Sequence, residues 1–275
     1  GGAQRWLSFA GVTIQPSEFM KLSIVLMIAH FFYNNRGKQE YTIVDIGVLI
    51  LQVLLVFVLI FKQPDFGTAG VCLAIACAQL MFIRLRISFR AIFIMILGAF
   101  TTASVGWFFL LRPYQKLRIL NLLNPDLDPS GSGYNSLQSL VAVGSGGQWG
   151  KGFMHGTQNQ LQFLPARHTD FIFSVFAEEH GLSGCVGVFS GIVLLCLTGL
   201  SIARGAKDSF ASIAAVGICA LIFIEFSLNT AMVLAMFPVV GMPLPFFSYG
   251  GSSLITIASA CGMLVGIDRY TKKQG

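Results

Sequence analysis

The sequence has little charge: Asp, Glu, Lys and Arg make up 11% of its 275 residues, whereas 55% are hydrophobic. Soluble domains carry about 25% charged residues, so this deficit excludes an ordinary soluble domain. Apolar stretches of about 17–25 residues, the length needed to cross a bilayer, recur along the chain. We therefore expect lipid to surround most of it.

Cysteine pairs and a leader segment are also missing. The six Cys residues show no CxxC spacing and lie in or at the start of apolar stretches. This pattern argues against a disulfide framework or a metal site and is typical of small buried side chains. The chain begins without Met and without the charged segment of a signal peptide. We therefore expect its true N-terminus to lie elsewhere.

The apolar stretches predict an all-α fold, a polytopic membrane helical bundle. Seven segments have the required length and composition, namely residues 19–34, 43–61, 68–84, 91–111, 182–203, 209–236 and 253–268. We expect residues 1–275 to form a single transmembrane domain.

The basic residues give this bundle an orientation. They fall in alternate connections, as Arg36 and Lys38; Arg84, Arg86 and Arg90; Arg204 and Lys207; and Arg269, Lys272 and Lys273. By the positive-inside rule that side is cytoplasmic, which places the C-terminus inside and the N-terminus outside. The net charge of +6 is thus mainly an orientation signal, and its spread over four loops argues against nucleic-acid binding. Membrane proteins commonly have an even number of spans, and seven are predicted here. We therefore expect an odd number of further spans upstream.

The outward connections are chemically different. Residues 1–18, 62–67, 112–181 and 237–252 hold most of the Pro residues and nearly every remaining charge. The connection 112–181, between the fourth and fifth segments, is far longer than usual loops, and such loops are functional or disordered. Its aromatic residues and Gly-rich turns argue against disorder. The sequence therefore places the active surface on the outside.

The outward connections also carry distinctive motifs. They are Gly2-Ala3-Gln4-Arg5-Trp6, Gln15-Pro16-Ser17-Glu18 with Lys21, Gln63-Pro64-Asp65-Phe66-Gly67, Gly156-Thr157-Gln158, Arg167-His168-Thr169-Asp170-Phe171, Pro238-Val239-Val240-Gly241 and Ser248-Tyr249-Gly250-Gly251. In this order they resemble the SEDS family (shape, elongation, division and sporulation proteins), in particular its rod-shape branch. The resemblance covers the whole chain. Family members have ten spans, so it implies that three are absent here.

The resemblance implies a function. SEDS proteins are peptidoglycan glycosyltransferases of the bacterial cytoplasmic (inner) membrane, which polymerise lipid II, the undecaprenyl-diphosphate-linked disaccharide-pentapeptide, at its outer face during elongation and shape maintenance. The implied partners are a class B penicillin-binding protein, which crosslinks the glycan strands as a transpeptidase, and other membrane proteins of the elongation complex. The resemblance also implies that Asp170 is the catalytic residue.

Elementary chemistry agrees with that role. Glycosyl transfer needs a base for the acceptor hydroxyl and positive charge near the departing diphosphate. Asp170 closes the long outer connection, where partial desolvation raises a carboxyl pKa. The basic candidates for holding diphosphate are Arg112, Lys116, Arg118, Lys151 and Arg167. Further candidate substrate-binding residues are Gln138, Gln158 and His168.

Each candidate also has an ordinary structural interpretation. Asp170, or equally Thr169, can cap the helix that follows it. Asp65 follows Pro64 at a span end, where an ordinary structural role at the helix start is favoured over binding of a cation or a sugar hydroxyl. The Gly-rich segment 144–152 matches no phosphate-loop pattern, so a flexible turn is favoured. Ser248 lacks the Gly-x-Ser-x-Gly context of a hydrolase and is taken as a supporting residue.

Several ionisable residues fall in or near the apolar segments. Glu18 and Lys21 are three residues apart on one helix face, either as an ion pair between helices or as a support for the loop that carries Asp170. Glu225 lies four residues before Asn229 on one face and matches no family motif. Glu178 and Glu179 make only a weak metal site, because helical spacing turns Glu179 away from Asp170.

The cofactor stays open, with a divalent cation such as Mg²⁺ as one option. One departure concerns Ala166, where the family usually has Glu. Two other functions stay open as well. A lipid II flippase needs a polar path that reaches both membrane faces, but the motifs crowd one face. A non-enzymatic scaffold that docks a transpeptidase needs no active carboxylate.

Overall fold

The computed structural model describes residues 5–9, 12–38, 40–85, 106, 111, 113–123, 131–156 and 169–273. Within these ranges the chain forms a short antiparallel hairpin and a bundle of helices. The elements are β1 (Leu7–Phe9), β2 (Val12–Ile14), α1 (Pro16–Asn34), α2 (Gly47–Lys62), α3 (Phe66–Met81), α5 (Pro113–Leu123), α6 (Ser132–Gly146), α8 (Ile172–Gly205), α9 (Ser209–Val233) and α10 (Gly251–Lys273).

The helix starts follow local sequence rules. Pro16 begins α1, where its missing N–H costs nothing and its fixed φ suits a first turn. Asp208 caps α9 by accepting a hydrogen bond from the Phe210 N–H at 3.4 Å. In α8 the helical geometry is broken at Gly181, whose φ is 65° and ψ is −164°. This break divides α8 into a short part before Gly181 and a long part after it.

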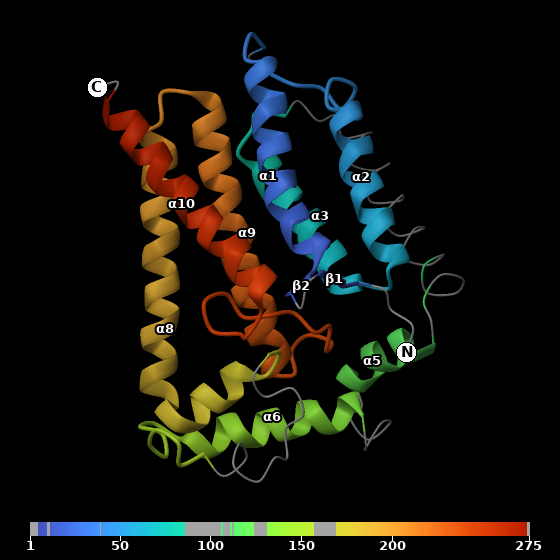
Figure 1. The fold of residues 1–275 in the computed structure, drawn as a ribbon, viewed down its shortest axis with the longest axis vertical. Helices are drawn as coiled ribbons and strands as arrows, with labels where there is room; N and C mark the ends of the chain where they lie inside the picture. The colour runs from blue at the N-terminus through green and yellow to red at the C-terminus, as the bar shows by residue number, and fades with distance from the viewer. Residues whose placement is uncertain are drawn as a thin grey trace.

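Helix α9 is the centre of the bundle, since it packs against α1, α3, α8 and α10. Figure 1 shows α1, α2 and α3 on one side of it and α8 on the other, with α10 crossing it diagonally and α5 and α6 crossing one end. The basic turn after α1, the turn after α8 and the C-terminal end of α10 all lie at the opposite end (Figure 1). The bundle therefore has one end of short basic turns and one end of helical connections.

The surface of the bundle is apolar. Large side chains on α2 and α8, such as Leu51, Leu55 and Leu194, are more than half exposed, whereas charged groups such as Glu18 and Glu225 are buried. By length and composition α8, α9 and α10 can each cross a membrane, and α2 and α3 are shorter apolar helices. This inverted distribution fits lipid as the solvent.

Six of the seven predicted segments coincide with helices. The fourth, 91–111, lies outside the described residues except for Gly106 and Leu111, so the count of seven stays a prediction. The fifth began at residue 182 in the prediction, whereas α8 begins ten residues earlier and continues through the break at Gly181. The long connection predicted at residues 112–181 is therefore partly helical, because it contains α5, α6 and the part of α8 before Gly181.

Candidate active site

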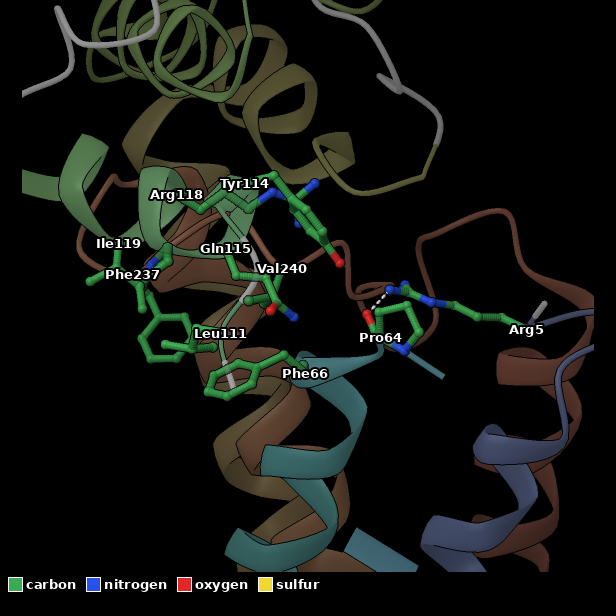
Figure 2. A pocket seen from close by; sticks show the side chains of 12 residues that line it. Arg5, Pro64, Phe66, Leu111, Tyr114, Gln115, Arg118, Ile119, Phe237 and Val240 are labelled. Carbon is green, nitrogen blue, oxygen red and sulfur yellow. Dashed lines mark hydrogen bonds between the residues drawn. The ribbon is translucent and has the colours of Figure 1, made fainter. Parts of the chain in front are cut away.

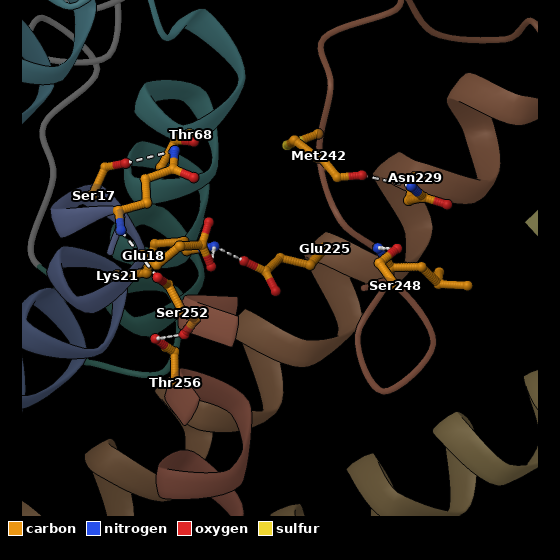
Figure 3. Close-up of polar contacts among 12 residues, drawn as sticks. Ser17, Glu18, Lys21, Thr68, Glu225, Asn229, Met242, Ser248, Ser252 and Thr256 are labelled. Carbon is orange, nitrogen blue, oxygen red and sulfur yellow. Dashed lines mark hydrogen bonds and ion pairs between the residues drawn. The ribbon is translucent and has the colours of Figure 1, made fainter. Parts of the chain in front are cut away.

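The backbone just before α8 is fixed by two side chains. The Asn229 side-chain amide of α9 donates to the carbonyl of Asp170 at 3.0 Å and to that of Met242 at 2.6 Å. The Ser248 hydroxyl donates to the carbonyl of Thr169 at 2.6 Å and accepts the Leu244 N–H at 2.7 Å. Asn229, Met242 and Ser248 lie together in Figure 3. The turn at Asp170 is thus tied to α9 and to the segment before α10.

The capping interpretation of Asp170 and Thr169 is wrong. The residue at the N-cap position of α8 is Phe171, and no side chain makes a capping bond there. A capping side chain must sit at the N-cap to reach the N–H groups of the first turn. The Asp170 carboxylate lies one residue before that position. The Asp170 carboxylate is therefore not used to start the helix.

The surroundings of Asp170 favour a basic carboxylate. Burial raises the pKa of the Asp170 carboxyl above its ordinary value, and a hydrogen bond from Thr169 and the positive charge of Arg118 partly counter this. The direction is the one predicted from desolvation. A carboxylate with a raised pKa accepts a proton more readily, which suits a general base.

The segment before α10 passes directly against this carboxylate. Gly241 has a φ of +69°, and a Cβ added there would lie 3.2 Å from Oδ2 of Asp170. Glycine provides both the left-handed backbone and the space. The neighbouring Val240 lines a cavity, whereas Asp170 is not part of the lining.

That cavity has a volume of about 260 Å³. Its walls are mostly apolar and include Phe66, Ile119 and Phe237. Figure 2 shows Arg5 and Arg118 reaching it from opposite sides. An apolar cavity with two guanidinium groups suits a ligand that combines a hydrocarbon with an anion.

The structure brings only some of the predicted binding residues to this cavity. Arg118 lines it, and its guanidinium lies 5.8 Å from the centroid of the Tyr114 ring. Lys116 on α5 and Gln138 on α6 are partly buried but do not belong to its lining. Gln158, Arg167 and His168, together with Arg112, lie outside the described residues.

Arg5 was missed as a cavity residue. Its guanidinium donates to the carbonyls of Gln63, at 3.1 Å, and of Pro64, and lies 3.8 Å from Asp65. The signal was present, since Arg5 stands inside the first motif, but a motif does not show which distant segment its arginine reaches. These contacts hold Arg5 at the end of α2.

Comparisons with known proteins agree with this arrangement. The model of the FtsW/RodA/SpoVE family, described as cell cycle protein, matches residues 1–273. The peptidoglycan glycosyltransferase MrdB of Escherichia coli (strain K12) is 40% identical over 271 residues, which cover 98% of this chain and 72% of that protein. Stage V sporulation protein E of Bacillus subtilis (strain 168) is 35% identical, with 98% and 73% covered. The chain belongs to this family.

Solved structures show the same fold for this SEDS protein. One, described as structural coordination of polymerization and crosslinking by a peptidoglycan synthase complex, matches with a TM-score of 0.78 and 28% identity over 98% of this chain and 74% of that chain. The rod shape determining protein RodA of Thermus thermophilus matches with a TM-score of 0.65 and 26% identity over 98% and 70%. The chain is therefore a RodA-like SEDS protein, as its motifs predicted.

In this SEDS protein Asp65 has the favoured structural role, as a helix cap. It is the N-cap of α3, and its carboxylate accepts hydrogen bonds from the Thr68 N–H at 3.3 Å and the Thr68 hydroxyl at 3.0 Å. The Gln15 amide also donates to it at 3.1 Å. Asp65 thus joins the start of α3 to the start of α1 and to Arg5.

Glu18 and Lys21 form the expected ion pair, with 2.8 Å between Lys21 Nζ and Glu18 Oε2. Lys21 pairs in addition with Glu225 of α9, a contact between residues 204 positions apart. Figure 3 shows Lys21 between the two carboxylates. Ser252, at the start of α10, accepts the Gln15 N–H at 3.0 Å, so α1 is fixed at its N-terminal end as well.

Glu178 and the Gly-rich segment hold the part of α8 before Gly181. The buried Glu178 carboxylate pairs with Lys151 at 2.7 Å. Lys151, a candidate for holding diphosphate, therefore makes a structural contact. A Cβ added at Gly150 would lie 2.1 Å from the Glu179 carbonyl oxygen, so the segment is packed backbone and not the flexible turn that was favoured. Across the described ranges, no group of three or more His, Cys, Asp or Glu side chains is placed to hold a metal ion.

Proposed function

We propose that this chain is a peptidoglycan glycosyltransferase of the inner membrane that polymerises lipid II into glycan strands, with Asp170 as the general base. The observation that carries the proposal is the position of Asp170. Its carboxylate is not used as a cap, is partly buried, and lies within the electrostatic reach of Arg118, which lines an apolar cavity. The curated names of the relatives, peptidoglycan glycosyltransferase among them, give the same enzyme class.

The proposed step balances as a glycosyl transfer. Asp170 takes the proton of the acceptor hydroxyl while the oxygen bonds to the anomeric carbon of the donor sugar. The bond between that carbon and the diphosphate oxygen breaks, and the prenyl diphosphate leaves with the electron pair. Arg118 stabilises the negative charge that develops on the leaving group, and its forked guanidinium suits diphosphate oxygens.

The cavity accounts for the lipid part of the substrate. At about 260 Å³ it lies near the lower end of ligand sites, which run from about 300 to 1,000 Å³. A site of this size holds only the part of a prenyl chain next to the diphosphate, and the rest of the chain extends into the bilayer. Lys116, Gln138, Gln158, Arg167 and His168 stay proposed contacts for the sugar or diphosphate.

We place the end of the bundle that carries α5 and α6 at the outer face of the membrane. The basic turns and the C-terminus then lie in the cytoplasm, as the positive-inside rule requires. In this arrangement residues 1–275 form one domain with seven spans, and residues 112–181 form its outer catalytic connection. A class B penicillin-binding protein is the proposed partner, because the first of the two matched structures is a peptidoglycan synthase complex described as coordinating polymerization and crosslinking.

The test is polymerisation of labelled lipid II by the complete protein with its partner while transpeptidation is blocked. Asp170→Ala and Asp170→Asn should abolish glycan product but keep the melting temperature and partner binding. Normal product from either variant would refute the base assignment. Movement of lipid II across proteoliposomes without chain growth would indicate a flippase, and neither activity would indicate a scaffold.

A further inference from the structure

Three buried charges join α1 to α9 inside the bundle. Glu18, Lys21 and Glu225 are only 3%, 2% and 1% exposed. Lys21 donates to Glu18 and to Glu225, so one ammonium group is shared by two carboxylates. In Figure 3 the Glu225 side chain extends from α9 toward α1. The face of α9 that carries Glu225 is therefore held against α1 by charge as well as by packing.

The same face of α9 carries Asn229, which binds the backbone of the candidate catalytic residue, Asp170. Glu225 and Asn229 are four residues apart, which places them one above the other, about 6 Å apart along the helix axis. Asn229 donates to the carbonyls of Asp170 and Met242. Because one helical turn is stiff, the rotation and height of α9 set by Glu225 also set the position of the Asn229 amide.

Stability alone does not account for Glu225. A buried ion pair is often no more stable than apolar side chains of the same volume, and an ionisable group inside a membrane is costly and usually functional. Moreover, Oε2 of Glu225 has no hydrogen-bond partner among the residues that the structure describes. If Glu225 only joined two helices, apolar side chains could do so at a lower cost in free energy.

We infer that Glu225 is a positioning residue, which fixes Asn229 and through it the backbone of Asp170 by its contact with Lys21. The inference rests on the proposed role of Asp170 as the base. It assigns a function to a buried carboxylate of α9 that matches no family motif. The contact controls the placement of the base and therefore the turnover number, whereas substrate binding depends on the cavity.

Gln79 provides a matched control. It is fully buried on α3, and its amide donates to the carbonyls of Val25 on α1 and Ile213 on α9, at 3.2 and 3.1 Å. It therefore joins the same two helices by buried polar contacts. Ile213 lies sixteen residues before Asn229, about 24 Å away along the axis, so its contacts do not control the turn at Asp170.

The experiment compares Glu225→Leu, Glu225→Gln and Gln79→Leu in the complete protein with its transpeptidase partner. Glu225→Leu should lower kcat by about 10- to 100-fold, as expected for a misplaced catalytic group, and leave KM within about twofold. Glu225→Gln should keep most of kcat, since its amide oxygen still accepts from Lys21. Gln79→Leu should lower the melting temperature but not kcat. Parallel losses of kcat and melting temperature in the two Leu variants, or a normal kcat for Glu225→Leu, would overturn the inference.

A double variant tests the path through Asn229. Glu225→Leu combined with Asn229→Ala should be no slower than Asn229→Ala alone, because both act on one contact with Asp170. Additive losses would overturn this path. If Glu225→Leu fails to fold, Glu225→Asp replaces it: the shorter arm keeps the charge, and kcat should fall at an unchanged melting temperature, whereas a normal kcat would overturn the inference.

Asp170→Asn, measured in parallel, separates the two proposals. If Asp170→Asn polymerises normally, the base assignment fails, and the positioning role fails with it. If Asp170→Asn is inactive while Glu225→Leu has a normal kcat, only the positioning role fails.

Discussion

Replacing Gly241 by Ala should impair catalysis more than folding. The φ of +69° at Gly241 costs a residue with a side chain about 1–2 kcal/mol. The new Cβ would lie 3.2 Å from Oδ2 of Asp170, close enough to displace the carboxylate by a few tenths of an ångström. A 1 Å misplacement in a catalytic site can cost about 100-fold, so this displacement should lower kcat by about three- to tenfold.

Gly147 separates backbone strain from contact with the carboxylate. It also has a positive φ, of +57°, but a Cβ added there meets nothing within 4 Å. Gly147→Ala should therefore cost about 1–3 kcal/mol of stability, because its φ of 57° with a ψ of −149° is a conformation open essentially to Gly, and leave kcat unchanged. The assays are polymerisation of labelled lipid II with transpeptidation blocked, and thermal unfolding. A normal kcat for Gly241→Ala, or an equal loss of kcat in both variants, would refute the reasoning.

Two further predictions concern charge and capping. Arg118→Gln removes a positive charge that lowers the pKa of Asp170. The acid limb of the kcat–pH profile should therefore move to higher pH. A limb that stays in place or moves to lower pH would contradict the effect of Arg118 on Asp170. Asp65→Ala removes the cap of α3 and should lower stability by about 1–2 kcal/mol in thermal unfolding, while Asp65→Asn should restore most of it. Equal stability of Asp65→Ala and the parent protein would show that the cap contributes nothing.

The parts of the fold that depend on composition and local rules could be predicted from the sequence. The apolar segments predicted α1, α2, α3, α9 and α10 because lipid selects length and hydrophobicity directly. A structural role for Asp65 followed from its place before an apolar helix, and the structure shows that this role is capping. The helices α5 and α6 were missed, because their shorter, mixed sequences look the same whether they are helical or irregular.

The parts of the site that depend on distant contacts could not be predicted. Residue type alone favoured a cap at Asp170, but Asn229 and Ser248 hold the turn so that α8 starts one residue later. The pairing of Lys21 with Glu225 spans 204 positions, and no local pattern indicates it. Sequence spacing placed Glu225 and Asn229 on one helix face but did not show what either side chain contacts.

The contacts around Asp170 also follow from a physical demand of the membrane boundary. Where α8 begins and where the segment before α10 runs without helical structure, backbone carbonyls lack helical partners, and an unpaired carbonyl is costly there. Asn229 satisfies those of Asp170 and Met242, and Ser248 satisfies that of Thr169. The same hydrogen bonds therefore satisfy these carbonyls and fix the position of the carboxylate. Asn229→Ala would remove both effects together, so this variant alone cannot separate stability from catalysis. Gly241 and Glu225 make no bond to these carbonyls, which is why substitutions there isolate the placement of the base.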